Sequence, residues 1–105
     1  MIKRISQKDF LTLLENEKNF PIFDFREQNF FVQEYIIGSI NLPLATLQLS
    51  SDELYEHHKK HPVYIIGDHE GCATLEKRGF QHIFYVGLTI PKDIPIIRLG
   101  GLRHA

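Results

Sequence analysis

The sequence has a single cysteine and no long apolar run among its 105 residues. One cysteine cannot form an internal disulfide, which agrees with a reducing cytosol. No apolar stretch approaches the roughly 20 residues that a membrane-spanning helix requires. The residues after Arg4 are polar where a signal peptide needs an apolar core. We therefore expect a cytoplasmic protein that neither enters a membrane nor is exported.

The sequence also lacks an excess of charge of either sign. It has 12 Lys and Arg residues against 13 Asp and Glu residues, which gives a formal net charge of -1. A surface with so little net charge provides no long-range field that would attract a phosphate backbone. We therefore do not expect nucleic acid as a partner.

The alternation of short apolar runs with amphipathic helical stretches predicts an α/β protein, because parallel strands joined by helical crossovers produce this pattern. At 105 residues the chain can bury one core, so one domain is expected. Strands are predicted at 2–5, 21–25, 39–42, 63–66 and 82–86. One helix is predicted to start at residue 6, and three others to span 27–34, 52–60 and 72–78. The strand 63–66 is apolar throughout, which is typical of the middle of a parallel sheet.

Two of the predicted helices carry further signals. Ser6 is suited to cap the first helix, and Asp9 three residues later provides the acidic partner of a capping box. In the helix over 27–34, Phe30 and Phe31 are expected to face the core.

The most informative stretch is Asp24-Phe25-Arg26-Glu27, followed by Phe31 and by Ile36-Ile37-Gly38-Ser39-Ile40-Asn41-Leu42-Pro43. Without a gap it resembles the signature of rhodanese-like domains, in which Asp-Val-Arg-Glu precedes an aromatic residue and His-Ile-Pro-Gly-Ala-Ile-Asn-Ile-Pro. Tyr35 and Ile37 stand where this signature usually has His and Pro. The resemblance implies a three-layer rhodanese-like fold, with a mainly parallel central sheet flanked by helices. It covers about residues 1–86 and leaves 87–105 as an atypical tail.

The signature residues have structural roles in the family that the chain resembles. Asp24, Arg26 and Glu27 would tie the loop to the body of the domain by ion pairs and hydrogen bonds. We expect Arg26 to pair with a nearby carboxylate, and Asp24 to lie near the base of the loop that follows the central strand. Gly38 belongs to the same structural signature.

The resemblance also implies where chemistry would take place. In a rhodanese, the central strand leads into a loop that begins with a nucleophilic cysteine, in the pattern Cys-x-x-Gly-x-Arg. Backbone N–H groups and the dipole of the next helix stabilise the bound sulfur. Here Gly67 stands in the cysteine position, and the loop is shorter than the family pattern and has no arginine. The predicted degenerate active-site loop comprises Gly67, Asp68, His69, Glu70 and Gly71.

Cys72, the only thiol, lies near the start of the helix after this loop. A thiol in a first helical turn can have a lowered pKa, which makes Cys72 the candidate catalytic residue of a divergent sulfurtransferase or redox carrier. Asp68 and Glu70 oppose thiolate formation, which favours the other interpretation, that Cys72 is a packing residue. Both interpretations stay open.

No metal site or cofactor is expected. His57 and His61 have the i, i+4 spacing that can place two imidazoles on one helix face, but no third ligand is evident. The lysines between them would repel a cation. His69 is a candidate acid–base residue, against the simpler hypothesis that Asp68 caps the loop.

The tail departs from the family pattern. Pro91 and Pro95 forbid a regular helix between them, so 87–105 is expected to form an extended arm or a late strand at 96–99. On an extended arm, exposed apolar residues would favour association into a homo-oligomer. These residues are Ile94, Ile96, Ile97 and Leu99.

These features predict a rhodanese-like domain that has lost sulfurtransfer chemistry and acts as a binding or regulatory module. Its partner would be a protein or a small sulfur compound. The alternative is a thiosulfate or persulfide sulfurtransferase, or a redox carrier, that uses Cys72.

Overall fold

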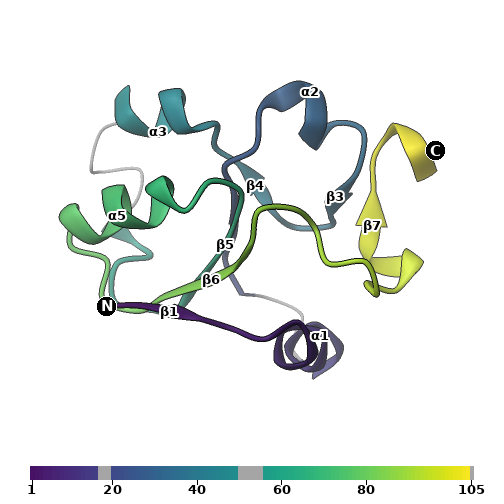
Figure 1. Cartoon of the computed structure of the whole chain (residues 1–105), viewed down its shortest axis with the longest axis horizontal. Helices are drawn as coiled ribbons and strands as arrows, with labels where there is room; N and C mark the ends of the chain where they lie inside the picture. The colour runs from purple at the N-terminus through teal and green to yellow at the C-terminus, as the bar shows by residue number, and fades with distance from the viewer. Residues whose placement is uncertain (17–19, 50–55, 105) are drawn as a thin grey trace.

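The computed structural model describes residues 1–16, 20–49 and 56–104 (Figure 1). In this part of the chain, five strands form one sheet in the order β1-β6-β5-β2-β4, and every neighbouring pair is parallel. The strands are β1 (Ile2–Arg4), β2 (Ile22–Asp24), β4 (Ile40–Asn41), β5 (Val63–Ile66) and β6 (Ile83–Gly87). The predicted parallel sheet is confirmed, with the predicted central strand in its middle. All carboxyl ends therefore lie at one edge of the sheet, and all amino ends at the other.

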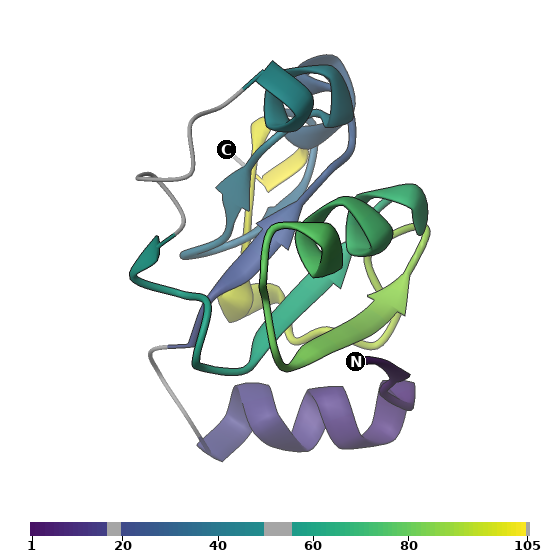
Figure 2. The ribbon, with the colours of Figure 1, turned by 90° about the vertical axis from the view of Figure 1, so that its left-hand side faces the viewer.

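Helices cover both faces of the sheet. The helix α1 (Gln7–Asn16) lies on one face, and α3 (Leu44–Leu49) and α5 (Glu70–Lys77) lie on the other (Figures 1 and 2). Alternate residues of β5 enter the two hydrophobic clusters, because side chains along a strand point to opposite faces. The three-layer α/β architecture predicted from the sequence is therefore confirmed. None of the described helices has the length and apolar character needed to cross a membrane.

The first helix begins as its sequence predicts. The backbone N–H of Asp9 donates a hydrogen bond to Ser6 Oγ at 3.1 Å, which satisfies one of the free amides of the first turn. Phe10 and Leu14 of α1 are buried against the sheet.

Replacing Ser6 by Ala is expected to lower the free energy of unfolding by about 1 kcal/mol, because the Asp9 amide loses its acceptor. Urea denaturation measures this loss. Thr12→Ala in the middle of the same helix is the matched control. It should leave stability unchanged or raise it slightly, because alanine has the higher helix propensity. Equal losses in the two variants would contradict the capping role.

The second predicted helix is much shorter than expected. The helix α2 (Gln28–Phe31) forms a single turn in place of 27–34. The expectation that Phe30 faces the core is wrong, since its side chain is 57% exposed. Phe31 is half-buried and stacks on Tyr35, with ring centroids 4.6 Å apart. The carbonyls of Val32 and Gln33 accept hydrogen bonds from the backbone of residues 102 and 103, so the end of the tail is held against the segment that follows α2.

The region between β4 and β5 differs from the prediction in another way. The helix α3 was not predicted, although Leu47 at its centre is fully buried. The backbone N–H of Leu47 donates to the carbonyl of Pro43 at 2.9 Å, so the proline lies where a helix start tolerates it. Residues 52–55 of the helix predicted at 52–60 lie outside the described residues, Glu56 is helical, and 57–60 form turns.

The tail folds back on the domain, so of the two predicted alternatives the structure has the late strand and not the extended arm. The strand β7 (Leu99–Gly100) pairs antiparallel with β3 (Tyr35–Ile36), after the 3-10 turn η1 (Ile96–Arg98). A strand was therefore correctly expected near 96–99, but it is shorter and starts later. Ile94 is buried and Leu99 packs against the cluster beneath α1, so these two no longer favour association. A second 3-10 turn, η2 (Leu102–His104), ends the described chain.

Candidate functional site

The loop after β5 begins at Gly67, at the carboxyl edge of the sheet. Its N–H donates to the Gly87 carbonyl at 2.9 Å, and its own carbonyl accepts a hydrogen bond from the Tyr85 hydroxyl at 2.7 Å. Gly67 has φ +117°, which favours glycine. A Cβ there would lie 3.0 Å from Phe25 Cβ and 3.1 Å from the Arg26 backbone nitrogen. A side chain at this position would therefore be strained by the backbone conformation and pressed against its neighbours.

The first amides of α5 all have acceptors within the loop. The N–H of Glu70 donates to Asp68 Oδ1 at 2.9 Å, and the N–H of Gly71 donates to the Asp68 carbonyl at 3.0 Å. The N–H of Cys72 donates to the His69 carbonyl at 2.9 Å. The predicted capping of the loop by Asp68 is confirmed. These three amides are consequently not available to an anion, although a free helix N-terminus would offer them.

The ring of Phe25 fills the space between this loop and the sheet. Phe25 is 3% exposed, and its ring lies so close to Gly71 that no Cβ could be added there without displacing it. A glycine at 71 is thus required by packing. The ring occupies the volume beneath the start of α5.

The thiol of Cys72 lies in the core. The residue is 0% exposed and belongs to the cluster between the sheet and the helices α3 and α5. Burial raises the pKa of the Cys72 thiol to about 12, and the carboxylate of Glu76 acts in the same direction. This environment is opposite to the partly exposed, electropositive setting of reactive cysteines.

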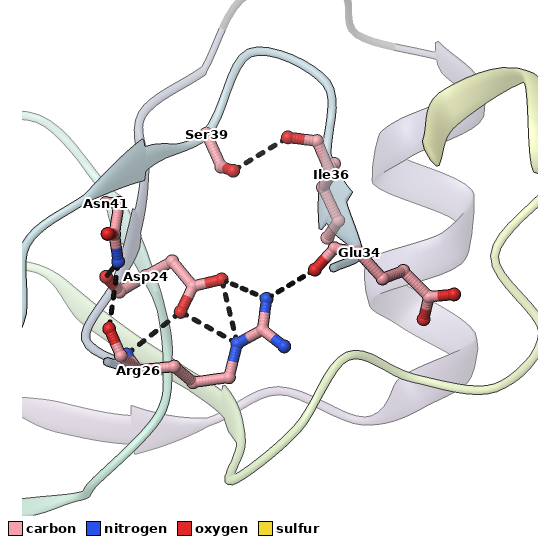
Figure 3. A network of polar contacts seen from close by, with 6 residues as sticks. All are labelled: Asp24, Arg26, Glu34, Ile36, Ser39 and Asn41. Atoms are coloured by element: carbon pink, nitrogen blue, oxygen red, sulfur yellow. Dashed lines mark hydrogen bonds and ion pairs between the residues drawn. The ribbon is translucent and has the colours of Figure 1, made fainter. Parts of the chain in front are cut away.

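Asp24 and Arg26 form a buried ion pair at the end of β2 (Figure 3). Arg26 Nη2 donates to Asp24 Oδ2 at 2.7 Å, and Arg26 Nε donates to both carboxylate oxygens at 3.0 and 3.1 Å. Arg26 Nη2 also donates to the Glu34 carbonyl at 2.7 Å. The carboxylate partner expected for Arg26 is therefore Asp24 itself, and the pair fixes the turn before β3.

Two further signature residues extend this network. Asn41 Nδ2 donates to the carbonyls of Asp24 and Arg26 at 3.1 and 2.9 Å, which ties β4 to the end of β2. Gly38 forms the turn before β4 at φ +92°. Glu27 stands apart, with an exposed side chain that caps no amide of α2. The arrangement positions loops and presents no reactive group.

Comparisons with known proteins agree with the fold and the signature. The sequence model of the rhodanese-like domain matches residues 6–92. The chain belongs to the rhodanese-like domain family. A comparison with curated proteins finds no significant match.

Solved structures share the fold of this rhodanese-like domain. The solution NMR structure of the rhodanese-like domain from the Anabaena sp. Alr3790 protein aligns with a TM-score of 0.73 at 18% identity, over 100% of this chain and 83% of that chain. A crystal structure of the Alr3790 protein aligns with a TM-score of 0.61 at 22% identity, over 78% of this chain and 68% of that chain. Similarity at these identities shows the fold alone.

The histidines of the rhodanese-like domain do not assemble a metal centre in the described part of the chain, where no group of three or more potential ligands occurs. The rings of His57 and His58 lie 5.1 Å apart. Burial lowers the pKa of His58, and the neighbouring His57 and His61 add a smaller effect in the same direction. His69 is exposed, and its ring contacts that of Tyr85 at 4.8 Å.

Two residues that shape the loop, Phe25 and Tyr85, were not predicted from the sequence. Phe25 could have been found, because the family signature has the smaller Val at this position and a larger ring must fill additional space. Tyr85 carries no such signal, since an aromatic residue in a strand is common. Only the folded structure shows that its hydroxyl donates a hydrogen bond to the Gly67 carbonyl.

The burial of Cys72 predicts slow thiol chemistry. In the native domain, alkylation by iodoacetamide should be orders of magnitude slower than in urea, because the thiol stays protonated and covered up to strongly alkaline pH. The rate measured against pH should show no midpoint below the ordinary thiol value of about 8.5. A midpoint below that value in the folded protein would contradict the packing role of Cys72.

Proposed function

We propose that this rhodanese-like domain does not transfer sulfur and acts as a binding or regulatory module. The observation that carries the proposal is the conformation of Gly67, which the resemblance places at the nucleophile position. Its positive φ and the close approach of Phe25 and Arg26, at 3.0 to 3.1 Å from a Cβ placed there, disfavour a sulfur-bearing side chain.

Two other features of the loop support the proposal. A persulfide anion needs N–H donors, and the amides of residues 70, 71 and 72 are bonded within the loop. Catalysis also needs an accessible thiolate, whereas Cys72 is buried and its pKa is raised to about 12. The sulfur or redox carrier that uses Cys72 is thus the less supported alternative. The lone thiol suits a reducing compartment, and we place the domain in the cytoplasm on that ground.

A thiosulfate-to-cyanide assay tests the proposal. With the full chain, thiocyanate formation is expected to equal that of buffer alone, and an active rhodanese serves as the positive control. Cys72→Ser is the matched variant and should behave like the unsubstituted chain. Turnover that is present in the natural sequence and lost in Cys72→Ser would establish the alternative function.

A further inference from the structure

A groove with a volume of about 640 Å³ lies at the edge of the sheet opposite the loop of residues 67–71. The first residues of β2 and β4 line it, together with the start of β5, the second half of α1 and the turn η1. In a parallel sheet these amino ends lie far along the strands from the carboxyl ends, so the groove is separate from the degenerate loop. Its volume is within the range of small-molecule sites.

The described residues that line the groove bring positive charge and no carboxylate. Arg98 lines it together with His57, His58 and His61, and no Asp or Glu is among its lining residues. Arginine stays ionised at any physiological pH. The ion pairs found among the described residues do not include Arg98.

Arg98 also has an unmet hydrogen-bonding requirement. Its Nε is buried and has no hydrogen-bond partner in the described part of the chain. Buried donors are almost always bonded in folded proteins, so such a donor indicates a missing acceptor. The backbone around Arg98 is well fixed, since its carbonyl accepts the Ile37 N–H at 2.8 Å and its own N–H donates to Pro95 at 2.8 Å. The backbone of Arg98 is therefore fixed, while its buried Nε has no acceptor among the described residues.

The rest of the wall is largely apolar. Phe20, Ile37 and Tyr64 contribute to it, and Tyr64 and Phe20 meet edge to face at 5.1 Å. A ligand that satisfies both parts of the groove needs one anionic group and an apolar body. A carboxylate suits the planar fork of a guanidinium in a way that a halide cannot.

We infer that this groove binds a small organic carboxylate, with its anionic group at Arg98 and its apolar body against Phe20, Ile37 and Tyr64. Inorganic phosphate fits less well, because it would leave the apolar wall exposed to water. The inference rests on the proposed binding role. It is independent of the sulfurtransfer assay, which can fail or succeed whatever the groove binds.

NMR titration of the full 15N-labelled chain with 2-naphthoate tests the inference. Saturable shifts are expected in the amide resonances of Ile37, Gly38 and Tyr64. The uncharged 2-naphthalenemethanol should bind at least tenfold more weakly, and inorganic phosphate should produce no shifts at the same concentrations. Arg98→Gln is expected to weaken naphthoate binding at least tenfold, and Arg98→Lys should retain part of it.

Arg4→Gln is the matched control. It removes an exposed guanidinium from β1, the edge strand on the other side of the sheet from β4, and should leave affinity unchanged. The spectra themselves report whether each variant is folded. If Arg98→Gln does not fold, the comparison of naphthoate with its alcohol on the natural sequence decides. Equal affinity for the two compounds, phosphate binding as tightly as naphthoate, shifts confined to other residues, no shifts at all, or a folded Arg98→Gln that binds unchanged would each overturn the inference.

Discussion

Replacing Gly67 by Cys is expected to lower the free energy of unfolding by about 3 kcal/mol and not to create a sulfurtransferase. The substitution restores the residue type that the family signature has at this position, but the backbone has φ +117°, which L residues rarely adopt. The new Cβ would also lie 3.0 Å from the Phe25 Cβ and 3.1 Å from backbone atoms of Phe25 and Arg26. The amides needed to stabilise a persulfide would still be bonded within the loop. Urea denaturation and thiocyanate formation measure the two effects.

Gly38→Cys is the matched control for this substitution. Gly38 also has a positive φ, of +92°, but a Cβ there would have no atom within 4 Å. The control should therefore show backbone strain alone, with a loss of about 1 kcal/mol. Equal losses at the two glycines would show that the contacts at Gly67 are unimportant. Thiocyanate formation by Gly67→Cys would show that the loop can still hold an anion.

Replacing Asp24 by Ala is expected to lower the free energy of unfolding by about 3–5 kcal/mol. Asp24 is 0% exposed and Arg26 is 16% exposed, so the substitution leaves a largely buried guanidinium without its carboxylate. Arg26 also holds the Glu34 carbonyl, so the turn before β3 should loosen as well. Chemical denaturation measures the loss, and hydrogen exchange at residues 33–36 reports on the turn.

Two comparisons separate this pair from an ordinary surface ion pair. Glu56→Ala removes the exposed partner of Lys59 and should cost at most about 1 kcal/mol. The double variant Asp24→Ala with Arg26→Met should be more stable than the sum of the two single losses predicts, because no charge is left unpaired. A small loss in Asp24→Ala, or strict additivity in the double variant, would contradict the structural role of the pair.

The regular part of the fold was predictable because its signals are local. The segment Val63–Ile66 is apolar throughout, and the structure places it at the centre of the sheet. The Ser6 cap needs only residues three positions apart. The tail was not predictable in this way. Leu99–Gly100 pairs with Tyr35–Ile36, more than 60 positions away by their numbering, so no local pattern indicates this pairing.

In the candidate site, too, some features were predictable from the local sequence and others depend on distant contacts. The signature alone indicates that Gly67 stands at the nucleophile position. The strain that a side chain would meet there depends on the approach of Phe25 and Arg26, which only the structure shows. The saturation of the α5 amides depends on the turn made by Asp68 and His69. No local pattern predicted the groove at Arg98, because its lining residues come from distant segments.

Intact-protein mass spectrometry shows whether the domain can carry sulfur, after incubation of the full chain with thiosulfate and, separately, with an organic sulfane-sulfur donor. The mass is expected to stay unchanged in both samples, because Gly67 has no side chain and the thiol of Cys72 is buried. A mass increase of one sulfur atom that is reversed by a reductant and absent in Cys72→Ser would contradict this expectation.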